Sequence, residues 1–228
     1  MGAHRTDGSS NSEFMISDSM KLVLASTSPR RREILSLLGL PFEVVAPDYE
    51  EEIVAYRPAE DEVLGFAQGK ARSVAGDYPE GLIIGSDTLI QIDGEKIGKP
   101  DGIADAKRIL RVLSGRTHRI LTGVAIIDGT GGPGLETVEE VTVQMQSYSE
   151  QQIESYLSCG ESLDKAGAYS IQGEGRGLIA TIQGDYLAAV GLPLKPIGSY
   201  LCRRKIAFSL DMEKLYTDRA YRNWQSFA

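Results

Sequence analysis

One segment, residues 21–40, constrains the fold more than any other part of the chain. It begins with the β-rich run at residues 22–25, passes through small polar residues, and reaches Ser28, a good helix N-cap, and Pro29, which suits the first helical position. Apolar residues at helical spacing follow, and Gly39 ends the pattern. This order predicts a buried strand that leads directly into a helix.

Further strand and helix patterns alternate along the chain. The predicted strands cover residues 42–45, 81–86, 89–92, 95–97, 118–127, 138–146 and 178–182, and the predicted helices cover residues 58–75, 104–113, 149–160 and 196–205. Asp93 and Gly94 form a strong two-residue hairpin signal between two of these strands. Because helices alternate with strands early and hairpins intrude in the middle, we expect an α/β fold with a mixed central sheet flanked by helices.

Length and the two ends of the chain set the domain organisation. The 228 residues are enough for one large domain or for two small lobes around a shared core. Residues 1–19 are polar and have no periodic pattern, so we expect a disordered leader or residues added for expression. Residues 20–207 form the expected folded domain, and residues 208–228 form a C-terminal extension to which the sequence assigns no role.

Charge and composition exclude several classes of protein. A net charge of −8 argues against a protein that coats nucleic acid, although a local arginine cluster can still bind a small anion. No apolar run approaches the ~20 residues that span a bilayer. Two cysteines and two histidines fit a reduced cytoplasmic protein and exclude a histidine-rich zinc site. Any metal is therefore expected to be held by oxygen, which favours Mg²⁺ or Mn²⁺.

The start of the first helix is a candidate anion site. Ser26, Ser28 and three consecutive arginines lie where the free N–H groups and the dipole of a helix favour a phosphate. Successive helical residues point about 100° apart, so the three arginines cannot all face one ligand. We expect Arg30 to face it and Arg31 and Arg32 to stay on the surface. The alternative is that all three are solvated surface residues.

Carboxylates supply the second candidate group. Asp87 and Thr88 follow an apolar strand, and strand ends in open α/β sheets border ligand sites. The acidic loop that contains Glu50, Glu51 and Glu52 could hold a divalent cation beside Asp87, which would then bridge phosphate oxygens. An aspartate that caps a turn and a solvated acidic loop are the alternative interpretations.

Three lysines and one amide complete the candidate set. Lys70 shares a helical face with Phe66, and an inward-facing lysine needs an anion. Lys99 follows the hairpin, and Lys165 begins a run of small residues that contains Gln172. This run allows close approach of a flat ligand, and Gln172 could read the edge of a base by paired hydrogen bonds. For each lysine taken alone, surface solvation is the alternative.

Two other motifs are better explained by structure than by chemistry. Residues 129–134 match G-x-G-x-x-G, but a strand pattern follows where the dinucleotide fingerprint needs a helix, so we predict a hairpin loop. No G-x-x-x-x-G-K-[ST] motif is found in the sequence. Cys159 has no neighbouring histidine in the sequence and is expected to be a small buried residue rather than a nucleophile.

Six segments taken together resemble the Maf family of nucleotide pyrophosphatases. The matching segments are LASTSPRRREIL (24–35), the acidic residues 48–52, FAQGKA (66–71), GSDTLIQIDGEKIGKP (85–100), LSGRTHRILTGVAI (113–126), and DKAGAYSIQGEG with GDYLAAVGLPL (164–194). They occur in the family's order and cover about residues 21–205. The AGAYSIQG segment resembles the subgroup that acts on dTTP and UTP.

The resemblance implies a fold shared with inosine triphosphate pyrophosphatases, with two lobes around a cleft, and a homodimer. It also implies metal-dependent cleavage of a nucleoside triphosphate to the monophosphate and pyrophosphate. By position, Asp87 matches the family's proposed general base. Other matching positions are those linked to substrate choice (Arg30, Thr88 and Gln172) and further active-site positions (Glu51, Lys70, Lys99 and Lys165). Glu51 and Asp87 are the expected metal ligands, and Ser26 is expected beside the substrate.

Two alternatives stay open at this point. A 7-methyl-GTP or CTP pyrophosphatase would have the same fold, although the 7-methyl-GTP subgroup carries a different sequence at the segment with Gln172. A non-catalytic nucleotide-binding regulator of cell division is the second alternative, because some family members are tied to effects on division. The expected partner in each case is a nucleotide, with neither nucleic acid nor membrane.

Overall fold

The described residues, 20–130 and 134–227 of a computed structural model, form one seven-stranded mixed sheet. The strands are β1 (Leu22–Ala25), β2 (Glu43–Val45), β3 (Leu82–Ile92), β4 (Glu95–Ile97), β5 (Thr117–Asp128), β6 (Leu135–Met145) and β7 (Ile179–Gln183). Their order is β2-β1-β3-β5-β6-β7, with β4 paired to β3. The strands β2, β1 and β3 are parallel, and the other pairs are antiparallel, so the predicted mixed sheet is confirmed.

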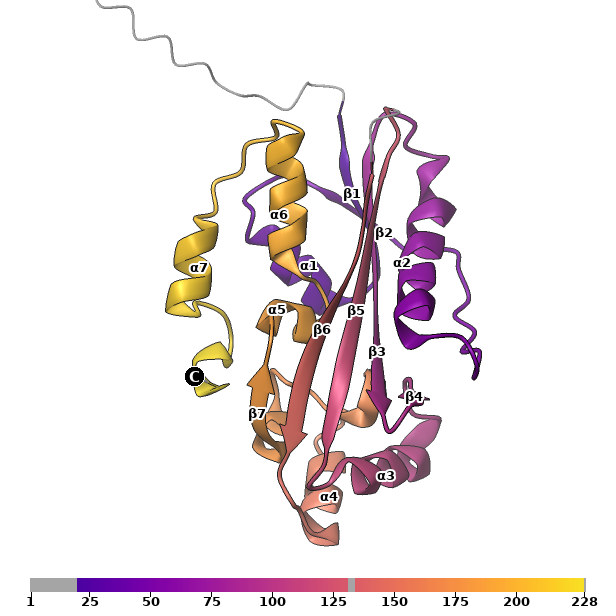
Figure 1. Cartoon of the computed structure of the whole chain (residues 1–228), viewed down its shortest axis with the longest axis vertical. Coiled ribbons are helices and arrows are strands. Elements are labelled where there is room, and N and C mark those ends of the chain that lie inside the picture. Colours follow the sequence, from indigo (N-terminus) through magenta and orange to yellow (C-terminus); the bar gives the residue numbers. More distant parts are fainter. Residues whose placement is uncertain (1–19, 131–133, 228) are drawn as a thin grey trace, which may run out of the picture.

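Helices cover both faces of this sheet (Figure 1). They are α1 (Pro29–Ser36), α2 (Ala59–Ala75), α3 (Gly102–Leu113), α4 (Glu150–Leu157), α5 (Tyr186–Val190), α6 (Leu194–Arg203) and α7 (Met212–Asp218). Helix α2 lies alone on one face, whereas α1, α5, α6 and α7 lie on the other (Figure 1). Among the described residues, no helix has the length and apolar character needed to cross a membrane.

The three long strands β3, β5 and β6 run through both lobes of the molecule (Figure 1). One lobe holds β1, β2, α1 and α6, and the other holds β4, α3, α4 and the irregular segment before β7. On its outer edge, β3 pairs with β1 as far as Gly85 and with β4 only from Ile90 onward. This leaves a gap in the sheet edge between the lobes, where residues 86–89 have no ladder partner on that side within the described part of the chain.

Helix α2 approaches the sheet closely because glycines lie beneath it. A Cβ on Gly85 of β3 would come within 2.1 Å of the Ala67 carbonyl oxygen, and a Cβ on Gly123 of β5 would come within 2.6 Å of the Val63 carbonyl oxygen. Any larger residue at either position would push the helix outward. The glycines therefore bring the inner face of α2, including Lys70, directly over β3.

The hydrophobic core is divided by the sheet. The smaller clusters beneath α2 include Val63, Phe66 and Ile83. The large cluster lies on the opposite face and joins α1, α3, α4, α5 and α6 to the sheet. It includes Leu24, Ile34 and Leu35, so the apolar face predicted for α1 is buried as expected.

Most predicted elements are found, with shifted boundaries. The two strands predicted at 81–86 and 89–92 are wrong as separate elements, because β3 continues without a break through Asp87. Polar side chains fit inside this strand because its outer edge borders a cleft. Helix α4 begins with the predicted capping box at Ser149 and Gln152. The short helix α5 was not predicted.

The glycine-rich match at 129–134 connects β5 and β6, whose antiparallel pairing extends to Ile126 and Leu135. The predicted hairpin is therefore confirmed, while residues 131–133 of its loop lie outside the described residues. The expected leader, residues 1–19, also lies outside them. Residues 208–227, by contrast, fold as α7 and a 3₁₀ turn at Trp224–Phe227 that pack on the large core cluster.

Candidate active site

A cleft of about 740 Å³ opens between the two lobes at the gap in the sheet edge. Its lining comes from the β1–α1 junction, the acidic loop, the inner face of α2, the middle of β3, and residues 164–172. Every predicted site residue lines this cleft: Ser26, Arg30, Glu51, Lys70, Asp87, Thr88, Lys99, Lys165 and Gln172. Segments far apart in the sequence are thus brought to one place.

The β1–α1 junction is built as the sequence predicts. The Ser28 hydroxyl accepts a hydrogen bond from the Arg31 backbone N–H (3.5 Å), which caps α1. The Ser26 hydroxyl accepts from the Ser28 N–H (3.2 Å) and is buried. These two bonds fix the turn and direct the start of α1 toward the cleft, where an anion is favoured.

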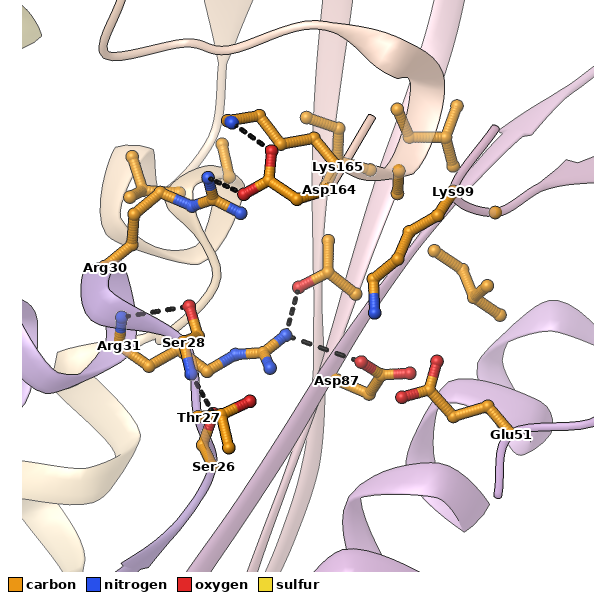
Figure 2. Close-up of a pocket in the computed structure, with 18 of the residues that line it drawn as sticks. Ser26, Thr27, Ser28, Arg30, Arg31, Glu51, Asp87, Lys99, Asp164 and Lys165 are labelled. Carbon is orange, nitrogen blue, oxygen red and sulfur yellow. Dashed lines mark hydrogen bonds and ion pairs between the residues drawn. The ribbon is translucent and has the colours of Figure 1, made fainter. Parts of the chain in front are cut away.

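Asp87 lies at the centre of the cleft floor, within β3. Its Oδ1 accepts a hydrogen bond from the Lys70 amino group (2.9 Å) and faces the Arg31 guanidinium at 3.5 Å. Its Oδ2 is buried and has no hydrogen-bond partner among the described residues. An unpartnered buried carboxylate oxygen is costly and needs a ligand, a water or an ion. Asp87 therefore offers one anchored oxygen and one free oxygen (Figure 2).

Arg31 corrects the prediction that only Arg30 faces the ligand. The Arg31 side chain is 12% exposed, and its Nε donates to the Gly191 carbonyl oxygen at 2.8 Å. Its terminal nitrogen also donates to the Thr88 hydroxyl at 3.2 Å. The argument from 100° spacing overlooked that a long side chain in the first helical turn can bend back toward the strand. Arg32 is exposed, as expected.

A network missed from the sequence supports this arginine. The Thr88 and Thr122 hydroxyls lie 3.1 Å apart, and Thr122 donates to the Ala188 carbonyl oxygen at 2.8 Å. Ser86 donates to the Gly191 carbonyl oxygen at 3.0 Å. These bonds join β3 and β5 to the end of α5. Alternating polar residues in two neighbouring strands are a sequence signal that could have indicated the network.

Lys70 links two carboxylates. Its side chain is 7% exposed, and its amino group lies 2.6 Å from Glu51 Oε1 and 2.9 Å from Asp87 Oδ1. The prediction that an inward Lys70 needs an anion is confirmed. Of the three consecutive glutamates, only Glu51 lines the cleft, and Glu50 and Glu52 lie outside its lining.

A buried ion pair holds the acidic loop in place. Lys96 and Glu62 lie 2.6 Å apart, with side-chain exposures of 4% and 0%. Lys96 also donates to the Val54 and Arg57 carbonyl oxygens, and the Val54 N–H donates to Glu62. These bonds connect the loop to β4 and α2, so the position of Glu51 depends on residues outside the cleft.

The opposite wall carries a second charged cluster. Arg30 lies 3.9 Å from Asp164, and Lys165 lies 2.5 Å from the same carboxylate (Figure 2). Burial lowers the pKa of Arg30, and Asp164 opposes that shift. Burial opposes ionisation of Asp164, but Lys165 and Arg30 hold its pKa below the ordinary value.

Lys99 and Gln172 both line the cleft. The Lys99 amino group points toward the side on which Asp87 and Glu51 lie (Figure 2). Gln172 Nε2 is buried and has no hydrogen-bond partner within residues 20–130 and 134–227. A donor in this state is available to a ligand that fills the cleft.

The carboxylates are compatible with a divalent cation. No group of three or more histidine, cysteine, aspartate or glutamate side chains suited to a metal occurs among the described residues. Mg²⁺, however, is commonly bound by one or two carboxylates together with substrate phosphates and waters. Glu51 and the free Oδ2 of Asp87 face the same space, so this donor set fits such an ion (Figure 2).

Neither cysteine belongs to the site. Cys159 and Cys202 are both free and exposed. The prediction that Cys159 is buried is therefore wrong, because this residue follows the last turn of α4, where the helix leaves the core. Neither residue lines the cleft.

Comparison with known proteins identifies the family. The family model described as Maf-like protein matches residues 21–204 of this chain. The chain is 46% identical to dTTP/UTP pyrophosphatase from Moorella thermoacetica over 181 residues, which cover 79% of this chain and 93% of the relative. It is 46% identical over 184 residues to the protein of the same name from Dictyoglomus thermophilum, covering 80% and 95% of the two chains. It is 41% identical over 194 residues to dTTP/UTP pyrophosphatase from Bacillus cereus, covering 84% and 97%.

Proposed function

Because this chain belongs to the family of Maf-like proteins, we propose that it is a nucleotide pyrophosphatase that hydrolyses dTTP and UTP to the monophosphate and pyrophosphate. The names of relatives that match at 41–46% identity support this activity and these substrates. The cleft supports it independently, since it combines a carboxylate with a free oxygen, several cations and a free amide at one site.

The observation that carries the proposal is the unpartnered Oδ2 of Asp87. In the proposed step, a water oxygen attacks the α-phosphorus in line with the departing group. The bond from water to phosphorus forms, the bond from phosphorus to the bridging oxygen breaks, and pyrophosphate leaves. Asp87 Oδ2 orients the water and accepts its proton, while Lys70 and Arg31 hold Oδ1 fixed.

The cations of the cleft are assigned to the phosphates. Arg30, Lys99 and Lys165 approach from the mouth, and the start of α1 with Ser26 adds backbone N–H groups. Catalysis of phosphoryl transfer depends mostly on positioning and on electrostatic stabilisation of the phosphate oxygens. A local concentration of cations performs this role although the whole chain is acidic.

Gln172 and Thr88 are assigned to the pyrimidine. Gln172 carries most of this assignment because its Nε2 is buried without a partner, and an amide can pair with both a donor and an acceptor on one base edge. The Thr88 hydroxyl already meets Arg31 and Thr122. Its contact with a base therefore depends on exchange of one of these bonds.

Glu51 and Asp87 would hold a Mg²⁺ or Mn²⁺ ion together with substrate oxygens. When bound, such an ion supplies positive charge that neutralises the charge developing on the phosphates. The homodimer that the resemblance implies and the cytoplasmic location that the low cysteine count favours are predictions of the same kind. Sedimentation of the purified chain tests the first, and fractionation of cells tests the second.

A substrate panel tests the proposed function directly. The wild-type protein is incubated with dTTP, UTP, CTP, GTP or 7-methyl-GTP in the presence of Mg²⁺ or Mn²⁺, and released pyrophosphate is measured. We expect the highest kcat/KM for dTTP and UTP. Preference for CTP or 7-methyl-GTP would replace the substrate assignment, and binding without any pyrophosphate release would favour the non-catalytic regulator.

A further inference from the structure

The C-terminal extension, residues 208–227, lies beyond the part of the chain that the family model matches. It is nevertheless tightly packed beside α5 (Figure 1). Trp224 is 7% exposed, stacks on Tyr186 with ring centroids 5.3 Å apart, and meets Tyr216 edge-on at 5.0 Å. Aromatic packing of this kind fixes the end of the chain to the body of the protein.

Polar bonds attach the extension to two elements that build the cleft. The Tyr216 hydroxyl donates to Asp185 Oδ2 at 2.8 Å, and Asp185 is the N-cap of α5. The Tyr186 hydroxyl donates to the Arg222 carbonyl oxygen at 2.6 Å. The Arg222 side chain forms an ion pair with Glu33 of α1 at 3.0 Å. The extension therefore bridges α5 and α1.

The last turn of the extension reaches the cleft wall itself. Asn223 Nδ2 donates to the backbone carbonyl oxygen of Gln172 at 2.7 Å. Tyr221 carries a buried hydroxyl that, like Gln172 Nε2, has no hydrogen-bond partner in the described part of the chain.

We propose that the C-terminal extension is a specificity element of the substrate site, in which Asn223 is a positioning residue for Gln172. Asn223 fixes the backbone of Gln172. The amide is thereby presented to the base in one orientation. The identity of the base in this inference rests on the proposed function. The positioning of Gln172 is tested separately, by the affinity for a nucleotide analogue.

A point variant of the full chain tests the positioning role. Asn223 has a φ of 60°, a left-handed conformation that glycine adopts readily, so Asn223→Gly removes the side chain without backbone strain. The matched control is Gln225→Ala, because the Gln225 amide also donates to a carbonyl oxygen, that of Asp218, but makes no contact with Gln172.

The first readout is the split between KM and kcat on dTTP and CTP. We expect Asn223→Gly to raise KM for dTTP about fivefold, the effect of one lost hydrogen bond, with kcat within about twofold. The preference for dTTP over CTP falls in parallel, and Gln225→Ala matches the wild type. A uniform fall in kcat on every nucleotide with unchanged KM would make the extension only a structural brace and overturn the proposal.

The second readout needs no catalysis. Calorimetry measures the affinity for an α,β-imido analogue of dUTP, which cannot release pyrophosphate, and we expect about a fivefold loss in Asn223→Gly. If the wild type hydrolyses no nucleotide but Asn223→Gly still binds the analogue more weakly, the proposed function fails and the positioning role stands. Affinity equal to the wild type in Asn223→Gly overturns the positioning role.

Discussion

The two walls of the cleft are built in different ways. The carboxylate wall, made of Arg31, Glu51, Lys70 and Asp87, lies on β3, on α2, at the start of α1 and on a loop tied down by a buried ion pair. Among the described residues, each of these four side chains forms an ion pair with another of them, and Asp87 Oδ2 has no hydrogen-bond partner. The loop wall, residues 164–172, is irregular and carries free polar groups such as Gln172 Nε2.

This difference separates fixed geometry from adjustable geometry. Groups on strands and helices are held in one position by the backbone ladder and by their ion pairs, which suits a step that needs preorganised charge. Groups on irregular backbone depend on outside supports, here the hydrogen bond that Asn223 donates to the Gln172 backbone. Changes in the carboxylate wall are therefore expected to affect kcat, and changes in the loop wall to affect KM and selectivity.

Asp87→Asn is expected to have the largest effect. The amide cannot accept the proton of water, so kcat for dTTP should fall by a factor on the order of 10³ with little change in nucleotide binding. Pyrophosphate release and calorimetry measure the two quantities. The control Asp77→Asn changes an exposed aspartate outside the cleft. Turnover near that of the wild type in Asp87→Asn would remove Asp87 as the base.

Lys70→Met ranks second. It leaves Asp87 and Glu51 facing each other without the cation between them, so we expect kcat to fall about 10²-fold through loss of positioned charge. Arg72→Met, an exposed residue on the same helix, is the control. If KM alone rises and kcat is unchanged, Lys70 serves binding rather than the chemical step, and the contrast between the walls fails.

Gln172→Ala tests the loop wall and should reduce the preference for dTTP over GTP about tenfold. Loss of the amide removes paired hydrogen bonds to the base, so the ratio of kcat/KM for dTTP over GTP should fall by that factor. Gln151→Ala, an exposed change on α4, should leave the ratio unchanged. An unchanged ratio in Gln172→Ala would show that base recognition lies elsewhere.

Acidification is expected to have the smallest effect, again through the loop wall. His118 Nε2 lies 2.7 Å from the hydroxyl of Tyr169, which lines the cleft. Burial lowers the pKa of His118 from 6.5 to about 4. As the pH falls, the unfolded chain therefore binds a proton at His118 at a higher pH than the folded protein does. The contribution of His118 to the free energy of unfolding is fully present above pH 6.5 and falls toward pH 4. The loss is about 1 kcal/mol at pH 5.5.

The His118→Gln variant should lose this part of the pH dependence, since glutamine does not titrate in this range. Urea unfolding at pH 7.5 and pH 5.5 measures the difference for both proteins. Equal pH dependence in the variant and the wild type would assign the effect to other groups.

The sequence predicts the carboxylate wall better than the loop wall, because regular elements leave periodic signals. Ser28 and Pro29 predict the start of α1, and the spacing from Phe66 predicts that Lys70 faces inward. Periodicity does not reveal that β1 ends at the level of Gly85 while β3 continues. For that reason Asp87 was predicted at a strand end and is found within a strand.

Contacts of the loop wall depend on long-range packing, which leaves no local pattern. The bond between Asn223 and Gln172 joins residues 51 positions apart and could not be read from either segment. The bend of Arg31 toward Gly191 spans 160 positions and is equally hidden. The polar and aromatic composition of residues 208–227 indicates neither a core face nor an anchor.

The continuous strands of the sheet also decide how the molecule unfolds. Strands β3 and β5 pair from Leu82 with Asp128 to Gln91 with Arg119, so one ladder serves both lobes. Neither lobe has a sheet of its own that could survive the loss of the other. Despite its two-lobed shape, the protein should melt in one cooperative transition, with equal calorimetric and van't Hoff enthalpies.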